Sequence, residues 1–139
     1  MIILDTNVLS ELMKGKPNVS CLRWFESQVS ANLFTTSVSQ AEIYYGVYVL
    51  PAGKRRSDLL AACQFVFEQE MIARVLPFDN EASTAFAQIV AHRRLLGKPI
   101  SQFDAQIAGI VRTRGAKLAT RKVADFENCG VDVLNPWNE

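Results

Sequence analysis

The sequence has little of what marks a secreted, membrane-bound or redox-active protein. Its three cysteines, Cys21, Cys63 and Cys129, are widely spaced and form no Cys-x-x-Cys pair. This spacing predicts core or half-buried free thiols in a reducing cytoplasm. No apolar run approaches the roughly 20 residues of a membrane span. Asp5 interrupts the first apolar residues, and no basic segment precedes them, which argues against a signal peptide. We therefore expect a cytoplasmic protein without membrane contact.

Histidine and net charge are also scarce. The only histidine, His92, has no second histidine as a partner for acid–base catalysis, so we expect it at the surface. The net charge of +1 indicates no class of partner. The 139 residues, 49% of them hydrophobic and 21% charged, contain no repeat, linker or low-complexity segment. They predict a single globular domain over residues 1–139.

Short apolar runs alternate with helical patterns along the whole chain. Strands are expected over residues 2–4, 33–36, 74–76, 117–119 and 131–134. Helices are expected over 7–14, 17–30, 39–50, 54–70, 81–96 and 101–114, and the second would bury Leu22, Phe25 and Val29. Short strands separated by helices are typical of a parallel sheet. The fold class is therefore α/β, with a five-stranded parallel sheet and helices on both faces.

Acidic residues occur at or near the strand-to-helix junctions of this pattern. Asp5 follows the first strand, Glu42 lies in the turn after the second, and Asp125 follows the fourth. Asp104 begins the helix before the fourth strand, and the loop before it would have to bring it to the same edge of the sheet. Four such acids would repel one another unless a cation lay among them. Oxygen ligands without His or Cys suit Mg²⁺ or Mn²⁺, which can activate a water for attack on a phosphate.

Each acid also has a purely structural interpretation. Asp5 could cap the helix that follows it. Glu42 and Asp104 each lie three residues after a serine, which is the spacing of a capping box. Asp125 could be an exposed turn residue. What favours a common site is the shared edge of the sheet.

Several segments together resemble a known family. They are Leu4-Asp5-Thr6-Asn7-Val8-Leu9-Ser10-Glu11, Ser37 through Ala41-Glu42-Ile43 to Gly46, Asp104-Ala105-Gln106-Ile107-Ala108, Ala119-Thr120-Arg121 with Asp125-Phe126, and Asn135-Pro136-Trp137. In order and spacing they resemble the PIN-domain ribonucleases of the VapC and FitB toxin type, from bacterial type II toxin–antitoxin pairs. The resemblance covers the whole chain.

The resemblance implies a PIN-like fold and Mg²⁺- or Mn²⁺-dependent endonucleolytic cleavage of RNA. Asp5 and Asp104 would be the principal metal ligands, and Glu42 would orient or deprotonate the attacking water. Thr6, Asn7 and Thr120 would support these acids through hydrogen bonds. It also implies a homodimer and a cognate antitoxin whose tail covers the acidic cleft.

Lys122 departs from the family pattern, which usually has Asn or Asp after Thr120-Arg121. Its ammonium would compete with a metal for the carboxylates. Asp125 would then be the fourth acid of a one-metal site. Alternatively, Lys122 turns outward to bind a phosphate. Arg121 and Lys122 are the candidate contacts to RNA phosphates, whereas most other basic clusters, at 54–56, 93–98 and 112–114, are expected on the solvated surface.

Two other functions fit parts of the sequence. In the first, Lys122 has weakened the site, and a PIN-like module only binds antitoxin or RNA. In the second, Asp5 is the nucleophile of a phosphatase or phosphotransferase. That chemistry normally requires another Asp two residues on, and position 7 is Asn.

Overall fold

Five short parallel strands form the centre of the molecule, in the order β3-β2-β1-β4-β5. The computed structural model describes residues 1–139. The strands are β1 (Ile2–Leu4), β2 (Leu33–Thr36), β3 (Val75–Leu76), β4 (Lys117–Ala119) and β5 (Asp132–Leu134). The expected five-stranded parallel sheet is confirmed, with β1 between β2 and β4.

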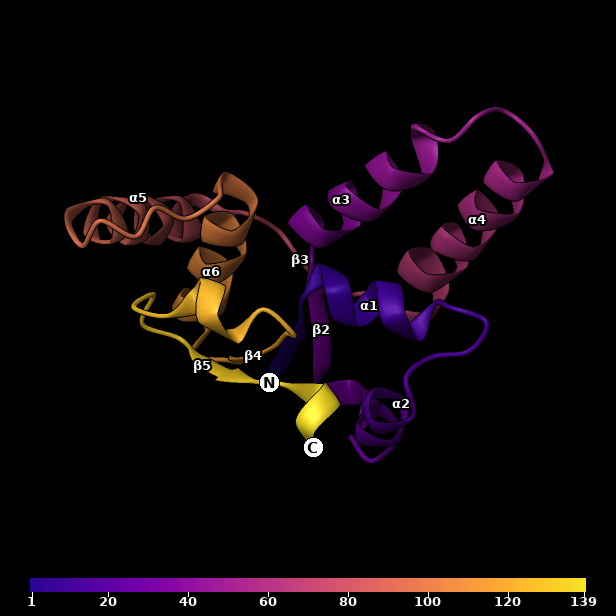
Figure 1. The fold of residues 1–139 in the computed structure, drawn as a ribbon, viewed down its shortest axis with the longest axis horizontal. Helices are drawn as coiled ribbons and strands as arrows, with labels where there is room; N and C mark the ends of the chain where they lie inside the picture. The colour runs from indigo at the N-terminus through magenta and orange to yellow at the C-terminus, as the bar shows by residue number, and fades with distance from the viewer.

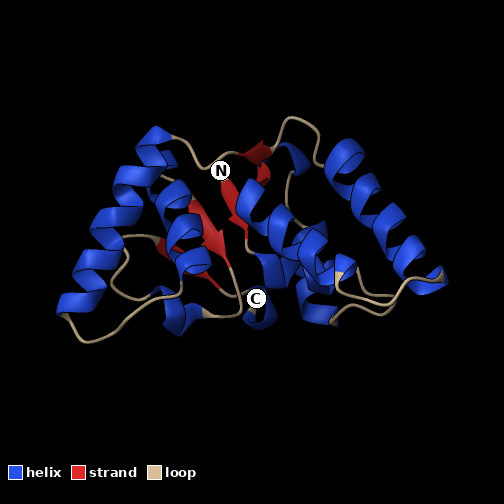
Figure 2. Ribbon diagram, turned by 90° about the horizontal axis from the view of Figure 1, so that it is seen from above, coloured by secondary structure: helices blue, strands red, loops and turns tan.

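Six α-helices surround this sheet (Figure 2). They are α1 (Thr6–Leu12), α2 (Val19–Glu26), α3 (Ser37–Tyr48), α4 (Lys54–Phe65), α5 (Asn80–Leu95) and α6 (Gln102–Arg114). A π-helical turn, η2 (Val66–Glu70), continues α4, and short 3₁₀ turns lie at η1 (Ser30–Asn32), η3 (Val123–Phe126) and η4 (Pro136–Asn138). Helices α5 and α6 lie on one side of the molecule and α1 to α4 on the other, with α3 and α4 as an outward-projecting pair (Figure 1).

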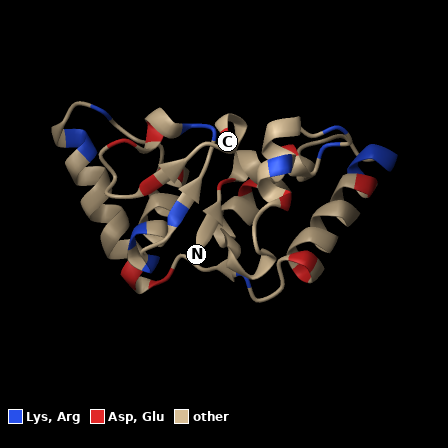
Figure 3. Cartoon of the chain, turned by 90° about the horizontal axis from the view of Figure 1, so that it is seen from below, with Lys and Arg blue, Asp and Glu red and all other residues tan.

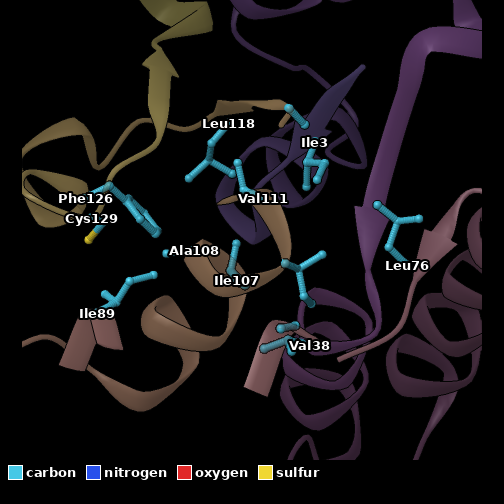
Figure 4. Packing of buried hydrophobic residues seen from close by; sticks show 13 residues of the cluster. Ile3, Val38, Leu76, Ile89, Ile107, Ala108, Val111, Leu118, Phe126 and Cys129 are labelled. Carbon is cyan, nitrogen blue, oxygen red and sulfur yellow. The ribbon is translucent and has the colours of Figure 1, made fainter. Parts of the chain in front are cut away.

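Two apolar cores cover the two faces of the sheet, because alternate strand residues point to opposite sides. Ile3 and Leu118 pack with α5 and α6 in one core, whose residues are drawn in Figure 4. The neighbouring Leu4 and Ala119 pack with α1 to α4 in the other. All three cysteines are free and buried within these cores, as expected. None of the helices has the length and hydropathy of a membrane-spanning segment.

The second helix differs from its prediction in length and in the face it buries. It ends at Glu26, and Val29 beyond it is 66% exposed. Cys21 and Trp24 are its buried residues, whereas Phe25 of the predicted stripe is half-buried and packs against the core. The predicted stripe had suitable helical spacing, but which face of a helix is buried depends on where the chain places it against its neighbours.

Parallel strands bring their carboxyl ends to one edge of the sheet, and this edge positions the candidate site. Asp5 directly follows β1, and Thr120 directly follows β4, which pairs with β1 in register. On the other side of β1, Thr36 ends β2 and leads directly into α3. Side chains from distant parts of the sequence therefore meet around the end of β1.

Gly109 allows the closest approach of α5 and α6, and its replacement should destabilise the protein. A Cβ at this position would lie 2.7 Å from the Ala82 carbonyl oxygen and 3.2 Å from the Phe86 nitrogen, both backbone atoms of α5. We expect Gly109→Ala to lower the free energy of unfolding by about 1–3 kcal/mol in urea denaturation, because the two helices must separate. Gly46→Ala is the matched control, since its Cβ would meet nothing within 4 Å. It should be neutral or stabilise α3 by about 0.5–1 kcal/mol. Equal effects of the two substitutions would contradict this account of the helix packing.

Candidate active site at the carboxyl edge of the sheet

Asp5 is the most deeply buried acid at this edge, with 1% of its surface exposed. It does cap α1, because its Oδ1 accepts a hydrogen bond of 2.8 Å from the Thr6 N–H. Its Oδ2 accepts from Thr120 Oγ1 at 2.7 Å and from Asn7 Nδ2 at 3.0 Å. Burial raises the pKa of Asp5, and the hydrogen bonds from Thr120 and Thr6 only partly offset this rise. Capping therefore accounts for one carboxylate oxygen, while the other is held by residues that have no part in the cap.

Asn7 and Thr120 tie the loop after β4 to the start of α1. The Asn7 amide donates to Thr120 Oγ1 at 3.1 Å, and its carbonyl oxygen accepts from the Arg121 N–H at 3.0 Å. Thr120 Oγ1 also accepts from the Lys122 N–H at 3.0 Å. These bonds fix the backbone that carries Arg121 and Lys122 beside Asp5.

Glu42 lies on α3 and faces α1 rather than its own helix terminus. Its Oε1 accepts a hydrogen bond of 2.8 Å from Thr6 Oγ1. The capping box expected at Ser39 does not form, because α3 begins at Ser37 and its N-cap is Thr36, whose hydroxyl accepts from the Ser39 N–H. Glu42 is therefore in the second turn of the helix, beyond the first-turn position expected from sequence. The structural interpretation of this acid is wrong, and its carboxylate is turned toward Asp5.

Glu42 lies near two other carboxylates, those of Asp5 and Asp104, and their charges affect its pKa. Burial raises its pKa, the hydrogen bond from Thr6 lowers it, and the negative charges of Asp5 and Asp104 raise it further. Asp104 also raises the pKa of Asp5. The three carboxylates from α1, α3 and α6 thus lie close enough to repel one another.

Asp104 enters this group from the first turn of α6 and is 7% exposed. Ser101 caps the helix by accepting a hydrogen bond from the Asp104 N–H, as expected. The Asp104 side chain instead pairs with Lys122, whose Nζ lies 2.8 Å from Oδ1. Burial lowers the pKa of Lys122, but the hydrogen bond and charge of Asp104, followed by the charges of Asp5 and Asp125, raise it above its ordinary value. The ammonium is therefore the positive charge that the structure places among these acids.

Asp125 lies on η3 and is exposed, in contrast to Asp5 and Asp104. It lines a cavity of about 180 Å³ together with Asp104 and Arg93, and its charge acts on Lys122. It is thus at the margin of the acidic group. Its role as a fourth acid stays a prediction.

Arg93 is a residue that the sequence assigned to the solvated surface, and the structure buries it. Only 6% of its surface is exposed. Its Nε donates to the Lys98 carbonyl at 2.7 Å, and one terminal nitrogen donates to the carbonyls of Asp125 and Glu127 at 2.8 and 2.9 Å. Arg93 therefore joins the loop before α6 to the segment around η3. The sequence does hold a signal for this burial, because position 93 continues the buried helical stripe of Ala82, Ala85 and Ile89.

Arg121 and Lys122 differ from the other basic residues in lying beside the acids. The Arg121 guanidinium rests over the ring of Trp137, 5.1 Å from its centroid, at the C-terminal end of the chain. Lysines and arginines elsewhere occur on both sides of the molecule and are interspersed with acidic residues (Figure 3). Arg121 and Lys122 are therefore the basic residues best placed to bind a phosphate near the acids.

The oxygen donors at this edge are of the kind that bind a hard divalent cation. The acids are nevertheless too far apart to coordinate a metal ion in this conformation. The oxygens come only from carboxylates and hydroxyls, which are Mg²⁺ and Mn²⁺ ligands. No group of three or more His, Cys, Asp or Glu side chains is close enough together to hold a metal. A physical reason is visible at Asp104, whose Oδ1 is engaged by the Lys122 ammonium. Metal binding here requires the acids to draw together and Lys122 to release Asp104.

Comparison with known proteins agrees with this fold. A model of the PIN domain family matches residues 2–126. The chain is 38% identical over 137 residues to VapC ribonuclease Y4jK of Sinorhizobium fredii, covering 99% of this chain and 98% of the relative. It is 32% identical to Toxin FitB of Neisseria gonorrhoeae over the full length of both proteins. The solved structure of FitAB bound to an IR36 DNA fragment superimposes with a TM-score of 0.91 at 32% identity, covering 99% of this chain and 96% of that one.

The chain therefore belongs to the PIN-domain family. Its full-length relatives within that family include VapC and FitB toxins.

Removal of the Lys122 charge should strengthen metal binding. In Lys122→Met the aliphatic stem is kept, but the ammonium that competes for Asp104 is lost. We expect Mg²⁺ to bind about tenfold more tightly, a gain of about 1.4 kcal/mol, in isothermal titration calorimetry. Lys54→Met is the matched control, because Lys54 pairs with Asp58 at 2.7 Å on the exposed surface of α4. Unchanged or weaker Mg²⁺ binding by Lys122→Met would mean that the ammonium does not compete with the metal.

Proposed function

We propose that this protein is a metal-dependent endoribonuclease and the toxin of a type II toxin–antitoxin pair. The observation that carries the proposal is the convergence of Asp5, Glu42 and Asp104, which lie at or near the N-terminal ends of α1, α3 and α6, within mutual electrostatic reach. Burying three carboxylates together is costly unless a cation offsets their charge. The printed names of the full-length relatives, a ribonuclease and a toxin, support the choice of RNA hydrolysis over other metal chemistry.

In this proposal each acid has a distinct task. Asp5 and Asp104 would hold Mg²⁺ or Mn²⁺, whose positive charge would polarise a phosphate and lower the pKa of a nearby water. Glu42 accepts the proton of the attacking water as it forms its bond to phosphorus. A carboxylate whose pKa is raised by burial and by neighbouring charge is a better base than an exposed one. The ribose oxygen leaves on the opposite side and takes up a proton from solvent.

Thr6, Asn7 and Thr120 hold the carboxylates of Asp5 and Glu42 in position through hydrogen bonds. Asn7 and Thr120 hold Asp5 Oδ2, which prevents that carboxylate from rotating. Thr6 connects the two sides of the site, because its N–H binds Asp5 and its hydroxyl binds Glu42. Such hydrogen bonds orient ligand and base before the substrate arrives, which lowers the cost of reaching the transition state.

In this proposal Lys122 has one role before RNA binds and another role afterwards. Without substrate it neutralises Asp104 in place of a metal. When RNA binds, its side chain, which is 43% exposed, can turn to a phosphate and leave Asp104 to the cation. Arg121, held on the Trp137 ring, provides a second phosphate contact. The proposal therefore assigns one metal ion to this site, because Lys122 stands at the position where the family pattern has a further Asn or Asp.

The proposed partner is a cognate antitoxin. The solved FitAB structure, which this chain matches over almost its whole length, is a complex of a FitB-like fold with a second protein and DNA. We expect the antitoxin of this protein to cover the acidic cleft and to assemble with a homodimer of this chain. A short reading frame next to this gene that encodes a DNA-binding protein would support this role.

A second function is favoured by the Lys122–Asp104 ion pair. If this pair persists when RNA and Mg²⁺ are present, the protein retains only binding of antitoxin or RNA. The two functions differ in whether RNA is cut.

Asp5→Asn should separate these functions. The substitution removes the charge of a principal ligand, and we expect RNA cleavage to fall about 10³-fold, or roughly 4 kcal/mol in activation free energy. The thermal stabilisation by millimolar Mg²⁺ or Mn²⁺ should disappear in the same variant. Gel-based cleavage of single-stranded RNA and thermal melting, each with EDTA and with added metal, measure both effects.

Asp58→Asn is the matched control, since its side chain is 63% exposed and pairs with Lys54 on the surface of α4. It should cleave RNA and gain stability from metal like the unmodified protein. Cleavage that persists in Asp5→Asn would exclude the proposed site. Absence of metal-dependent cleavage in the unmodified protein would favour the binding module.

A further inference from the structure

A cavity of about 300 Å³ opens beside Glu42 and is lined mainly by residues of α1, α3 and α4. Figure 1 shows how these three helices are arranged. Its rim is polar and includes Thr6, Ser10, Lys14 and Glu42. Its inner wall is apolar and is formed mainly by Met13, Ile43, Val47 and Leu59. The proposed hydrolysis uses Thr6 and Glu42 but gives no role to the rest of this cavity.

The position of this cavity limits which ligands it can bind. Thr6 and Glu42 belong both to the cavity and to the acidic group around Asp5. A substrate group seated in this cavity would therefore lie directly beside the group bound at the acids. In a polynucleotide, that group belongs to a nucleotide next to the bond that is cut.

We propose that this cavity is a subsite for the base of a nucleotide flanking the scissile phosphate. The proposal rests on the proposed ribonuclease function and extends it to substrate recognition. RNA is read by sequence mainly in single strands, whose bases can be turned out of the stack into a protein pocket.

The lining has the two kinds of surface that a nucleobase requires. The faces of the base pack against the apolar wall, and its polar edge remains at the rim. Ser10 can donate or accept a hydrogen bond there, and Lys14 can donate. The Lys14 ammonium lies at 3.0 Å from Glu11, so its position is partly fixed in advance. Recognition would be by edge contacts to one base rather than by stacking on an aromatic ring.

A second cavity makes an apolar protein side chain the weaker candidate. It measures about 290 Å³, lies between α1, α2 and α4, and ten of its eleven lining residues are hydrophobic. It includes neither Thr6, Glu42 nor any other candidate site residue. An apolar group of a protein partner fits that environment better than the polar rim beside Glu42.

Gly46 allows the subsite to be closed without disturbing the acids. It lies on the cavity wall in α3, and a Cβ at this position would meet nothing within 4 Å. In Gly46→Met the new side chain occupies the cavity, and the helix loses a glycine that weakens it. Ala41→Met is the matched control, since Ala41 is exposed on the same helix and does not line the cavity.

Base binding can be measured without cleavage. We would titrate methyl-labelled protein with each ribonucleoside 5′-monophosphate and with ribose 5-phosphate, which has no base, and follow the methyl signals by NMR. At least one nucleotide should shift the signals of Ile43 and Leu59, whereas ribose 5-phosphate should not. The signal of Ile107, in the core on the other face of the sheet, is the internal reference. Gly46→Met should weaken this binding about tenfold or more, and Ala41→Met should not change it.

The outcomes separate the subsite from the nuclease. Base-dependent shifts that survive in Gly46→Met, or shifts that ribose 5-phosphate produces equally, overturn the subsite. Ile43 and Leu59 signals that respond to the antitoxin but to none of the nucleotides also overturn it. If Gly46→Met melts at a lower temperature than Ala41→Met, Ser10→Met closes the same cavity from α1 and takes its place. Loss of the nuclease function would appear instead as absence of RNA cleavage while base binding remains.

Discussion

Repulsion among the carboxylates of Asp5, Glu42 and Asp104 is the constraint to which the rest of the site responds. Their burial and mutual repulsion raise the pKa of Asp5 and Glu42, and a single ammonium, that of Lys122, offsets their charge from within the group. Neutral donors add to this compensation at Asp5 and Glu42. The Thr6 N–H, the Asn7 amide and the Thr120 hydroxyl donate to Asp5, and the Thr6 hydroxyl donates to Glu42. The edge of the sheet is therefore an environment that favours any further positive charge, whether of a metal ion or of the chain itself.

Short strands, and loops held in place by side-chain hydrogen bonds, bring the three carboxylates together. Strands of two to four residues give little pairing of their own, so the edge depends on the two cores above and below the sheet. Asp104 and Lys122 lie outside the strands, and their relative position depends on Arg93, which binds backbone carbonyls on both sides. A buried guanidinium with no carboxylate partner is stable there because several carbonyl dipoles satisfy it. The acidic group is thus held by polar contacts that bridge separate loops.

Prediction from sequence succeeded where local pattern and topology agree. The bounds of β1, β2 and β4 follow from short apolar runs, and the common edge of Asp5 and Thr120 follows from parallel pairing alone. Prediction failed for the buried face of a helix and for the contact partners of single side chains. The second helix buries Cys21 and Trp24 instead of the stripe that ends at Val29, and Arg93 is buried instead of solvated. Serine spacing suggested a capping box from Ser39 to Glu42, but Thr36, three residues before Ser39, caps the helix, and Glu42 faces α1.

The sequence by itself determined the α/β class, the parallel sheet, the acids at its carboxyl edge and the similarity to PIN-domain toxins. These follow from periodicity, from strand-to-helix order and from motifs, all of which are local along the chain. Only the tertiary structure decided that Lys122 pairs with Asp104, that Arg93 joins two loops, and that a half-polar cavity lies beside Glu42. Lys122 and Asp104 are 18 positions apart, and Arg93 binds carbonyls 32 and 34 positions away. The geometry of these contacts depends on how the helices pack and which rotamers remain free. No local pattern carries that information.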